Sequence, residues 1–234
     1  AIVGLTAAFE GLADHVVLVE LDSQVAAVWE TILGGGAEWL AKEIMSFKVS
    51  YDNVNKVLGA DARSVEHEAF RTIVKNRTFH GGILAPGSSL IRSGENGKGL
   101  LSRWYPETLA RRIIAIGELR HKLTFIHGDG LEVISQYSSS KDACVFVDPP
   151  YTVVGETGKR AGKRLYACHE LDHELLFSRC SEVLGDVLMT YDDCPSVRDM
   201  ASRFGFSVRS VAMKSTHHAQ MTELLIGKSL DWCG

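Results

Sequence analysis

Asp148-Pro149-Pro150-Tyr151 is the segment of the sequence best suited to chemistry. Two consecutive prolines fix the backbone φ angle and remove two donors, and a residue before proline is pushed toward extended geometry. The result is a rigid turn that offers acceptors without competing N–H groups. Asp148 can accept one hydrogen of an amino group and the Pro149 carbonyl can accept the other, while Tyr151 can stack on a flat ring.

An exocyclic amino group held in this way becomes a better nucleophile. The adenine N6 lone pair is delocalised into the ring, and two acceptors in tetrahedral directions favour a localised lone pair aimed at a methyl donor. The same acceptors stabilise the positive charge that develops on nitrogen during attack. A paired adenine must first leave the duplex to reach such a turn. The tetrapeptide therefore indicates methyl transfer to an amino group of a base.

The position of the turn supports this interpretation over a purely structural proline turn. The apolar run Cys144–Val147 comes directly before Asp148 and reads as a buried strand. Open α/β sheets bind their ligands beyond the carboxyl ends of such strands.

The elements around the turn predict an α/β fold. Short apolar runs typical of buried parallel strands occur at Val16–Val19, Leu123–Ile126, Ala143–Val147 and Val187–Met189. Helical stretches separate several of them, at Gln24–Leu33, Pro106–Arg120 and His169–Leu184. Two late strands that could form a hairpin edge are expected at Ser207–Met213 and Thr222–Gly227. Alternating strands and helices are typical of a doubly wound sheet.

The strand–helix rhythm fails between residues 34 and 105. Gly34–Gly36 break the preceding helix, helical patterns continue through Val74, and Asn76–Arg103 is rich in glycine, serine and basic residues. We interpret residues 34–105 as a largely helical insertion that carries a recognition surface. Residues 1–33 and 106–234 are then expected to form the catalytic domain.

Composition and charge exclude few classes of protein. Hydrophobic residues make up 45% of the chain and charged residues 23%, which is ordinary for a globular protein. The net charge of −4 disfavours nucleic-acid binding only weakly, because binding depends on a local basic face. The five widely spaced cysteines include no C-x-x-C pair, so we expect no metal site and reduced thiols in the cytoplasm. No apolar run is long enough for a membrane span.

At the Asp148–Tyr151 turn the chain resembles the Dam-like family of adenine-specific DNA methyltransferases, and the resemblance runs through nearly the whole chain. It implies a Rossmann-like sheet, mostly parallel with a late antiparallel strand, and S-adenosylmethionine as the cofactor. It also implies site-specific methylation of adenine N6 in double-stranded DNA, with the target adenine flipped out. Whether the protein serves restriction-modification, a phage or cell regulation is left open.

Two further segments resemble the cofactor motifs of the family. Val17–Asp22 is similar to its second strand, so Glu20 is implied to bind the ribose hydroxyls, while Asp22 is expected to cap the next helix. Phe125–Gly130 is similar to the next motif, in which Asp129 is implied to contact the adenine ring of the cofactor. Asp148 completes the expected cofactor-binding set.

The resemblance also extends to the insertion and to the loop after the turn. Asn76-Arg77-Thr78 matches a stretch of the family's target-recognition region, and basic residues of the glycine-rich loop could close over DNA. The residues expected to bind DNA are Asn76, Arg77, Arg92, Lys159, Arg160 and Arg164. His173, on a predicted helix, is expected to pack or cap rather than catalyse.

The start of the chain departs from the family pattern. The family begins with a glycine-rich strand-to-helix turn that cradles the methionine part of the cofactor, and Ala1–Glu10 instead reads as the helix that follows it. We therefore expect the chain as given to bind S-adenosylmethionine poorly and to be inactive by itself.

Two other classes of function remain open. One is an amino-methyltransferase that acts on cytosine N4, RNA or a protein amide; Asp148 favours adenine, because cytosine-N4 enzymes more often carry serine and protein-amide enzymes asparagine at this position. The other is a non-catalytic DNA-binding relic of the fold. A methyl-transfer assay separates these classes.

Overall fold

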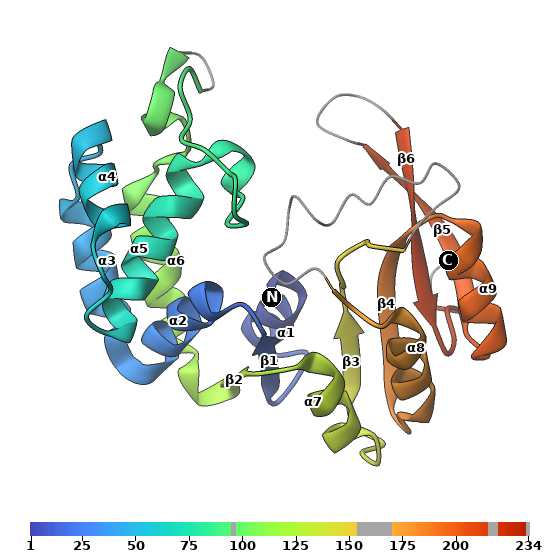
Figure 1. The fold of residues 1–234 in the computed structure, drawn as a ribbon. Coiled ribbons are helices and arrows are strands. Elements are labelled where there is room, and N and C mark those ends of the chain that lie inside the picture. The colour runs from blue at the N-terminus through green and yellow to red at the C-terminus, as the bar shows by residue number, and fades with distance from the viewer. Residues whose placement is uncertain (95–96, 154–169, 215–219, 233–234) are drawn as a thin grey trace. The chain divides into compact units, whose positions relative to one another are not determined.

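The computed structural model describes residues 1–94, 97–153, 170–214 and 220–232 (Figure 1). The chain divides into two compact units, Ala1–Gly128 and Asp129–Gly234. The division expected from the sequence, with residues 34–105 inserted into a domain made of 1–33 and 106–234, stays a prediction.

The first unit begins with the expected parallel strands. After helix α1 (Ile2–Glu10), strand β1 (Val16–Glu20) pairs in parallel with β2 (Leu123–His127), as the apolar runs predicted. Helix α2 (Ser23–Thr31) follows β1 and begins at Asp22, whose side chain accepts hydrogen bonds from the amides of Gln24 and Val25. The predicted helix cap is confirmed.

The rest of the first unit is a helical layer. Its elements are a π-helix (Ile32–Gly36), α3 (Ala37–Ser46), α4 (Tyr51–Gly59), α5 (Val65–Thr78), short 3₁₀ turns at His80–Gly82, Gly99–Arg103 and Arg120–Lys122, and α6 (Pro106–Glu118). Gly35 takes a φ of 99° inside the π-helix, so the glycines bend the chain between α2 and α3. A core that includes Leu40, Ile44 and Val74 holds these helices together. The described part of residues 34–105 is largely helical, as expected.

The second unit has a four-stranded sheet. Its elements are α7 (Gly130–Tyr137), β3 (Cys144–Val147), α8 (His173–Glu182), β4 (Asp186–Asp192), α9 (Pro195–Arg203), β5 (Ser207–Lys214) and β6 (Gln220–Gly227). The strand order is β3-β4-β6-β5, with β3 parallel to β4 and β6 antiparallel to both of its neighbours. The expected α/β class, with parallel pairs and a late antiparallel strand, is confirmed. The late strands do form a hairpin, but β6 lies inside the sheet and β5 is the edge strand.

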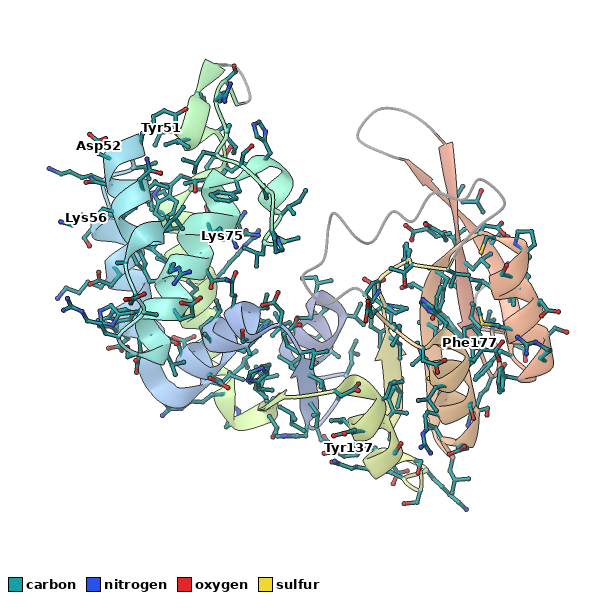
Figure 2. All side chains as sticks on the ribbon, in the orientation of Figure 1. Tyr51, Asp52, Lys56, Lys75, Tyr137 and Phe177 are labelled. Carbon is teal, nitrogen blue, oxygen red and sulfur yellow. The ribbon has the colours of Figure 1, made fainter. Side chains whose placement is uncertain are left out.

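One face of this sheet carries the core of the second unit. Val187, Met189 and Tyr191 alternate along β4 and pack with Phe177 of α8 and Ile226 of β6. Figure 2 labels Phe177, whose side chain is fully buried. The core thus fixes β4 beside β3, the strand that leads into the Asp148–Tyr151 turn.

Helix α8 begins later than the sequence indicated. The predicted start, His169, lies outside the described residues, and residues 170–172 are not helical. Asp172 accepts a hydrogen bond from the Leu175 amide at 2.9 Å and caps the helix, so that His173 is its first residue. No helix among the described residues combines the length and apolar character needed to cross a bilayer.

Candidate functional site

The Asp148–Tyr151 turn lies at the carboxyl end of β3, where a parallel sheet presents its ligand-binding edge. The exposed Asp148 carboxylate is oriented through one oxygen. Its Oδ1 accepts from Thr190 Oγ1 at 2.7 Å and from Tyr151 Oη at 3.0 Å. Within the described part of the chain no residue donates to Oδ2, so a fixed carboxylate keeps one oxygen for a ligand.

The two proline carbonyls of the turn differ. The Thr152 amide donates to the Pro150 carbonyl at 2.8 Å, which closes the turn on itself. No hydrogen bond to the Pro149 carbonyl is seen among the described residues. Pro149 itself is buried, so the acceptor that the sequence assigned to an amino hydrogen is unpaired among the described residues but belongs to a residue with little exposed surface.

Tyr151 is held as a hydrogen-bond donor with one face covered. Its ring stacks on Tyr191 of β4, with ring centroids 6.0 Å apart and an angle of 24° between the planes. Burial raises the pKa of Tyr151, and the nearby Asp148 carboxylate raises it further, so the phenol stays protonated and donates to Asp148. Tyr191 covers one face of the ring, so a substrate ring would have to stack on the opposite face.

Two more carboxylates lie near the turn. Asp192 and Glu223 are register partners across β4 and β6. Burial raises the pKa of both, and the charges of Asp192 and Asp148 raise that of Glu223 further. The surroundings of Asp148 are therefore acidic and suit a group that is cationic or becomes so.

His173 contacts the turn and was not assigned to the site from the sequence. Its Nε2 lies 2.8 Å from Thr152 Oγ1 and its Nδ1 lies 2.9 Å from Tyr191 Oη. Burial lowers the pKa of His173, and the charge of Asp172 raises it by a smaller amount. These partners are 21 and 18 residues away in the chain, so no local pattern could have revealed them.

The expected cofactor residues lie at the carboxyl ends of β1 and β2. Glu20 is the last residue of β1, and its Oε1 accepts from the Asp22 amide at 2.9 Å. Asp129 follows β2 and caps α7 by accepting from the Leu131 amide at 2.9 Å. Each side chain spends one carboxylate oxygen on a local hydrogen bond and retains a second oxygen.

The expected DNA-binding residues of the insertion have different environments. Asn76 donates to the Gly82 carbonyl at 2.7 Å and so supports the loop after α5. Arg77 is half-buried, and its pKa is lowered first by burial and then by Arg103 and Arg112. Arg92 is exposed. The expected roles of Asn76, Arg77 and Arg92 in DNA binding stay predictions.

Three expected DNA-binding residues, Lys159, Arg160 and Arg164, lie outside the described residues. Among the side chains that are described, no group of histidine, cysteine and acidic residues has the arrangement of a metal site.

Comparisons with known proteins add little to this geometry. No family model matches the chain, and no curated protein matches it. Among solved structures it is similar to the crystal structure of a candidate RNA methyltransferase from Pyrococcus horikoshii, at 16% identity and a TM-score of 0.28. The match covers 82% of this chain and 96% of that chain. A likeness of this degree fixes neither fold nor function, so function has to be inferred from the residues of the site.

Proposed function

We propose that the chain carries the catalytic turn of an S-adenosylmethionine-dependent methyltransferase that acts on the N6 amino group of adenine in DNA. The observation that carries this proposal is that the Asp148 carboxylate and the Pro149 carbonyl each have an acceptor atom that no described residue pairs. Asp148 is fixed through Oδ1 by Thr190 and Tyr151, and the turn satisfies the Pro150 carbonyl but not that of Pro149. Two fixed acceptors match the two hydrogens of an amino group.

The residues of the turn would prepare the amino nitrogen for attack. Asp148 Oδ2 accepts one hydrogen and the Pro149 carbonyl the other, so that the nitrogen lone pair is released from the ring. The new C–N bond would form as the bond between the methyl carbon and the donor's sulfur breaks. The nitrogen then becomes positively charged, and the acidic surroundings of Asp148 stabilise that charge. The excess proton then leaves to Asp148 or to solvent. The open face of Tyr151 supports the flipped base.

Glu20 and Asp129 fit the cofactor that the proposal requires. Each retains one carboxylate oxygen that can accept from ribose hydroxyls or from an exocyclic amino group. When bound, S-adenosylmethionine would supply the methyl group as an electrophile attached to a sulfonium. We propose Glu20, Asp129 and Asp148 as its contacts, and Arg77 and Arg92 as contacts to DNA phosphate or a guanine edge.

Methyl transfer and DNA binding, measured on the same variants, distinguish an enzyme from a binding relic. The assay follows tritium from labelled cofactor into unmethylated duplex DNA, with the full-length protein as the enzyme. Asp148→Ala is expected to abolish transfer and to leave the Kd for DNA within about twofold of wild type. Asp142→Ala, at an exposed acidic residue before β3, is the matched control. Equal transfer by the two variants would reject the role given to Asp148.

A further inference from the structure

A chain of hydrogen bonds runs behind the Asp148–Tyr151 turn. Thr152, the residue that follows Tyr151, contacts Nε2 of His173, and Nδ1 of the same ring contacts the hydroxyl of Tyr191 on β4. We call these three residues the histidine bridge. Tyr191 has only 1% of its surface exposed. The bridge thus joins the end of the turn to the buried core through one imidazole ring.

The partners favour one tautomer of the ring. The Thr152 hydroxyl lies 3.5 Å from the Pro150 carbonyl, which can only accept, although this contact is at the outer limit of a hydrogen bond. In the tautomer that fits it, Thr152 accepts from Nε2–H of His173 and Nδ1 accepts from the hydroxyl of Tyr191. Burial raises the pKa of Tyr191, which keeps that hydroxyl protonated. In this tautomer each donor of the histidine bridge, from Tyr191 through His173 to Thr152, donates in the direction of the Asp148–Tyr151 turn.

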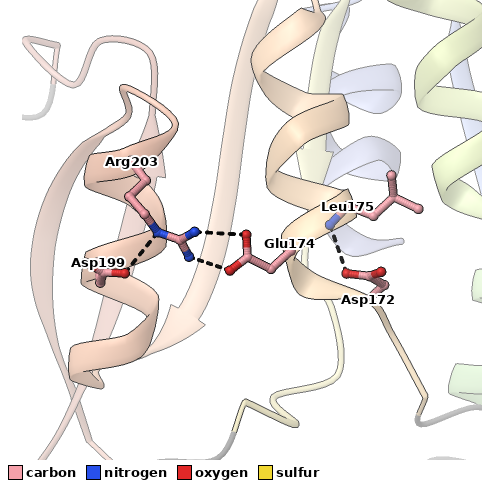
Figure 3. A network of polar contacts seen from close by, with 5 residues as sticks. All are labelled: Asp172, Glu174, Leu175, Asp199 and Arg203. Carbon is pink, nitrogen blue, oxygen red and sulfur yellow. Dashed lines mark hydrogen bonds and ion pairs between the residues drawn. The ribbon is translucent and has the colours of Figure 1, made fainter.

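The residues on either side of His173 in the sequence hold the start of α8 through polar contacts, which Figure 3 shows. Asp172 caps the helix on one side of His173. On the other side, the Glu174 carboxylate receives both terminal nitrogens of Arg203, which also donates through Nε to Asp199 at 3.0 Å. A two-pronged ion pair of this kind sets orientation more than stability at an exposed site.

We propose that His173 is a positioning residue for the catalytic turn: neutral and protonated on Nε2, it ties Thr152 to Tyr191 and so holds Asp148, Pro149 and Tyr151 in their reactive arrangement. It touches none of the reacting atoms and acts through Thr152 and through the ring stack of Tyr151 on Tyr191. This role rests on the function proposed above, whereas the bridge itself can be tested without any activity.

A second proton on His173 would break the bridge. An imidazolium carries hydrogen on both nitrogens, so Nδ1 could no longer accept from Tyr191. The Tyr191 hydroxyl would have to turn its hydrogen away and accept instead, which leaves a buried hydrogen without its acceptor. Among the described residues, the charged or titratable groups that line the pocket beside His173 are Asp172, Glu174, Asp199 and Arg203, and Tyr191 packs against the ring. Arg203 is paired with Glu174 and Asp199, which leaves Asp172 as the carboxylate that favours the charged form. Burial lowers the pKa of His173 by more than the charge of Asp172 raises it.

The first test reads the tautomer directly. Long-range ¹H–¹⁵N correlation spectra of the full-length protein, with His173→Gln used to assign the signal, show which nitrogen is protonated. The expected result is a neutral His173 with hydrogen on Nε2 at pH 7, and loss of this state together with the Tyr191 hydroxyl contact on acidification. A charged ring or hydrogen on Nδ1 at pH 7 would overturn the proposal.

The second test separates positioning from folding. His173→Gln and His173→Ala are compared with His121→Gln, which alters an exposed histidine of the first unit. The His173 variants are expected to lower kcat by about 10²-fold, as a misplaced reactive group does, with KM for DNA and cofactor unchanged and Gln less affected than Ala. Unchanged kcat in both, with the wild type active, overturns the positioning role and leaves the proposed function standing. An inactive wild type rejects the proposed function, while the spectra still decide the bridge.

Discussion

Replacing Tyr191 by phenylalanine removes one buried hydroxyl and leaves the aromatic ring in place. The stack on Tyr151 and the contact with Phe177, whose ring centroid lies 5.6 Å away, are retained. The variant therefore loses only the hydrogen bond to His173 Nδ1. It isolates the contribution of the histidine bridge to the stability of the second unit.

The size of the effect follows from the burial of the two partners. A hydrogen bond contributes about 0.5–1.5 kcal/mol net, and an acceptor left buried without a partner costs about 1–3 kcal/mol. Tyr191 is almost fully buried, but His173 is only half-buried, so water satisfies part of the orphaned nitrogen. We expect Tyr191→Phe to lower the free energy of unfolding by about 1–2 kcal/mol.

Urea unfolding measures this difference, with the midpoint shifting and the slope m unchanged. Tyr137→Phe is the matched control, because Tyr137 at the end of α7 is 39% exposed and surface changes usually stay within about 0.5 kcal/mol. If Tyr191→Phe also changed stability by less than about 0.5 kcal/mol, the bridge would contribute nothing and the reasoning would be refuted.

Three further predictions concern stability, each measured by urea unfolding. Gly117→Ala should destabilise the chain by about 1–3 kcal/mol, because the new Cβ would lie 2.8 Å from that of Ala37, even though alanine favours helices. The control Gly59→Ala, with open space around it, should be neutral or stabilising. Equal changes in stability for the two variants would contradict the close contact at Gly117. Asp22→Ala should cost about 0.5–2 kcal/mol by removing the cap of α2, while Asp22→Asn should recover most of it; no recovery would mean that charge rather than capping matters. Because the pKa of His173 is lowered in the folded protein, the unfolded chain binds the extra proton first as pH falls. The contribution of neutral His173 to the free energy of unfolding is therefore complete above about pH 6.5 and is lost as pH falls through the lowered pKa. His173→Gln should flatten the dependence of stability on pH in this range, and an unchanged dependence would assign it to other groups.

Local sequence patterns predicted the elements but not all of their limits. The apolar runs at Val16, Leu123 and Cys144 form strands, as short runs rich in β-branched residues indicate. The expectation that the Cys144–Val147 strand is buried was wrong in part, because Cys144 and Phe146 are exposed. Asp22 marked the start of α2 because a cap acts on amides two and three residues away. Asp172 acts in the same way on α8, but the helix-like residues before it concealed the cap.

The site was predictable where its residues are adjacent in the chain and not where they are distant. Asp148 to Tyr151 form one segment whose prolines dictate its geometry. Thr190 and His173 reach that segment only after β4 and α8 pack together, and nothing local to them signals it. The Asn76 side chain donates to the Gly82 carbonyl, a contact that depends on how the loop after α5 closes, and its expected role in DNA binding stays a prediction.

The most direct measurement of the central claim is the identity of the methylated nucleoside. DNA treated with the full-length protein and isotopically labelled S-adenosylmethionine is digested and analysed by mass spectrometry, for the wild type and for Asp148→Asn. Label in N6-methyladenine with the wild type, reduced by about 10²–10³-fold in the variant, is the predicted result. Label in N4-methylcytosine, or N6-methyladenine formed equally well by Asp148→Asn, would contradict a turn that grips the amino group of adenine through Asp148.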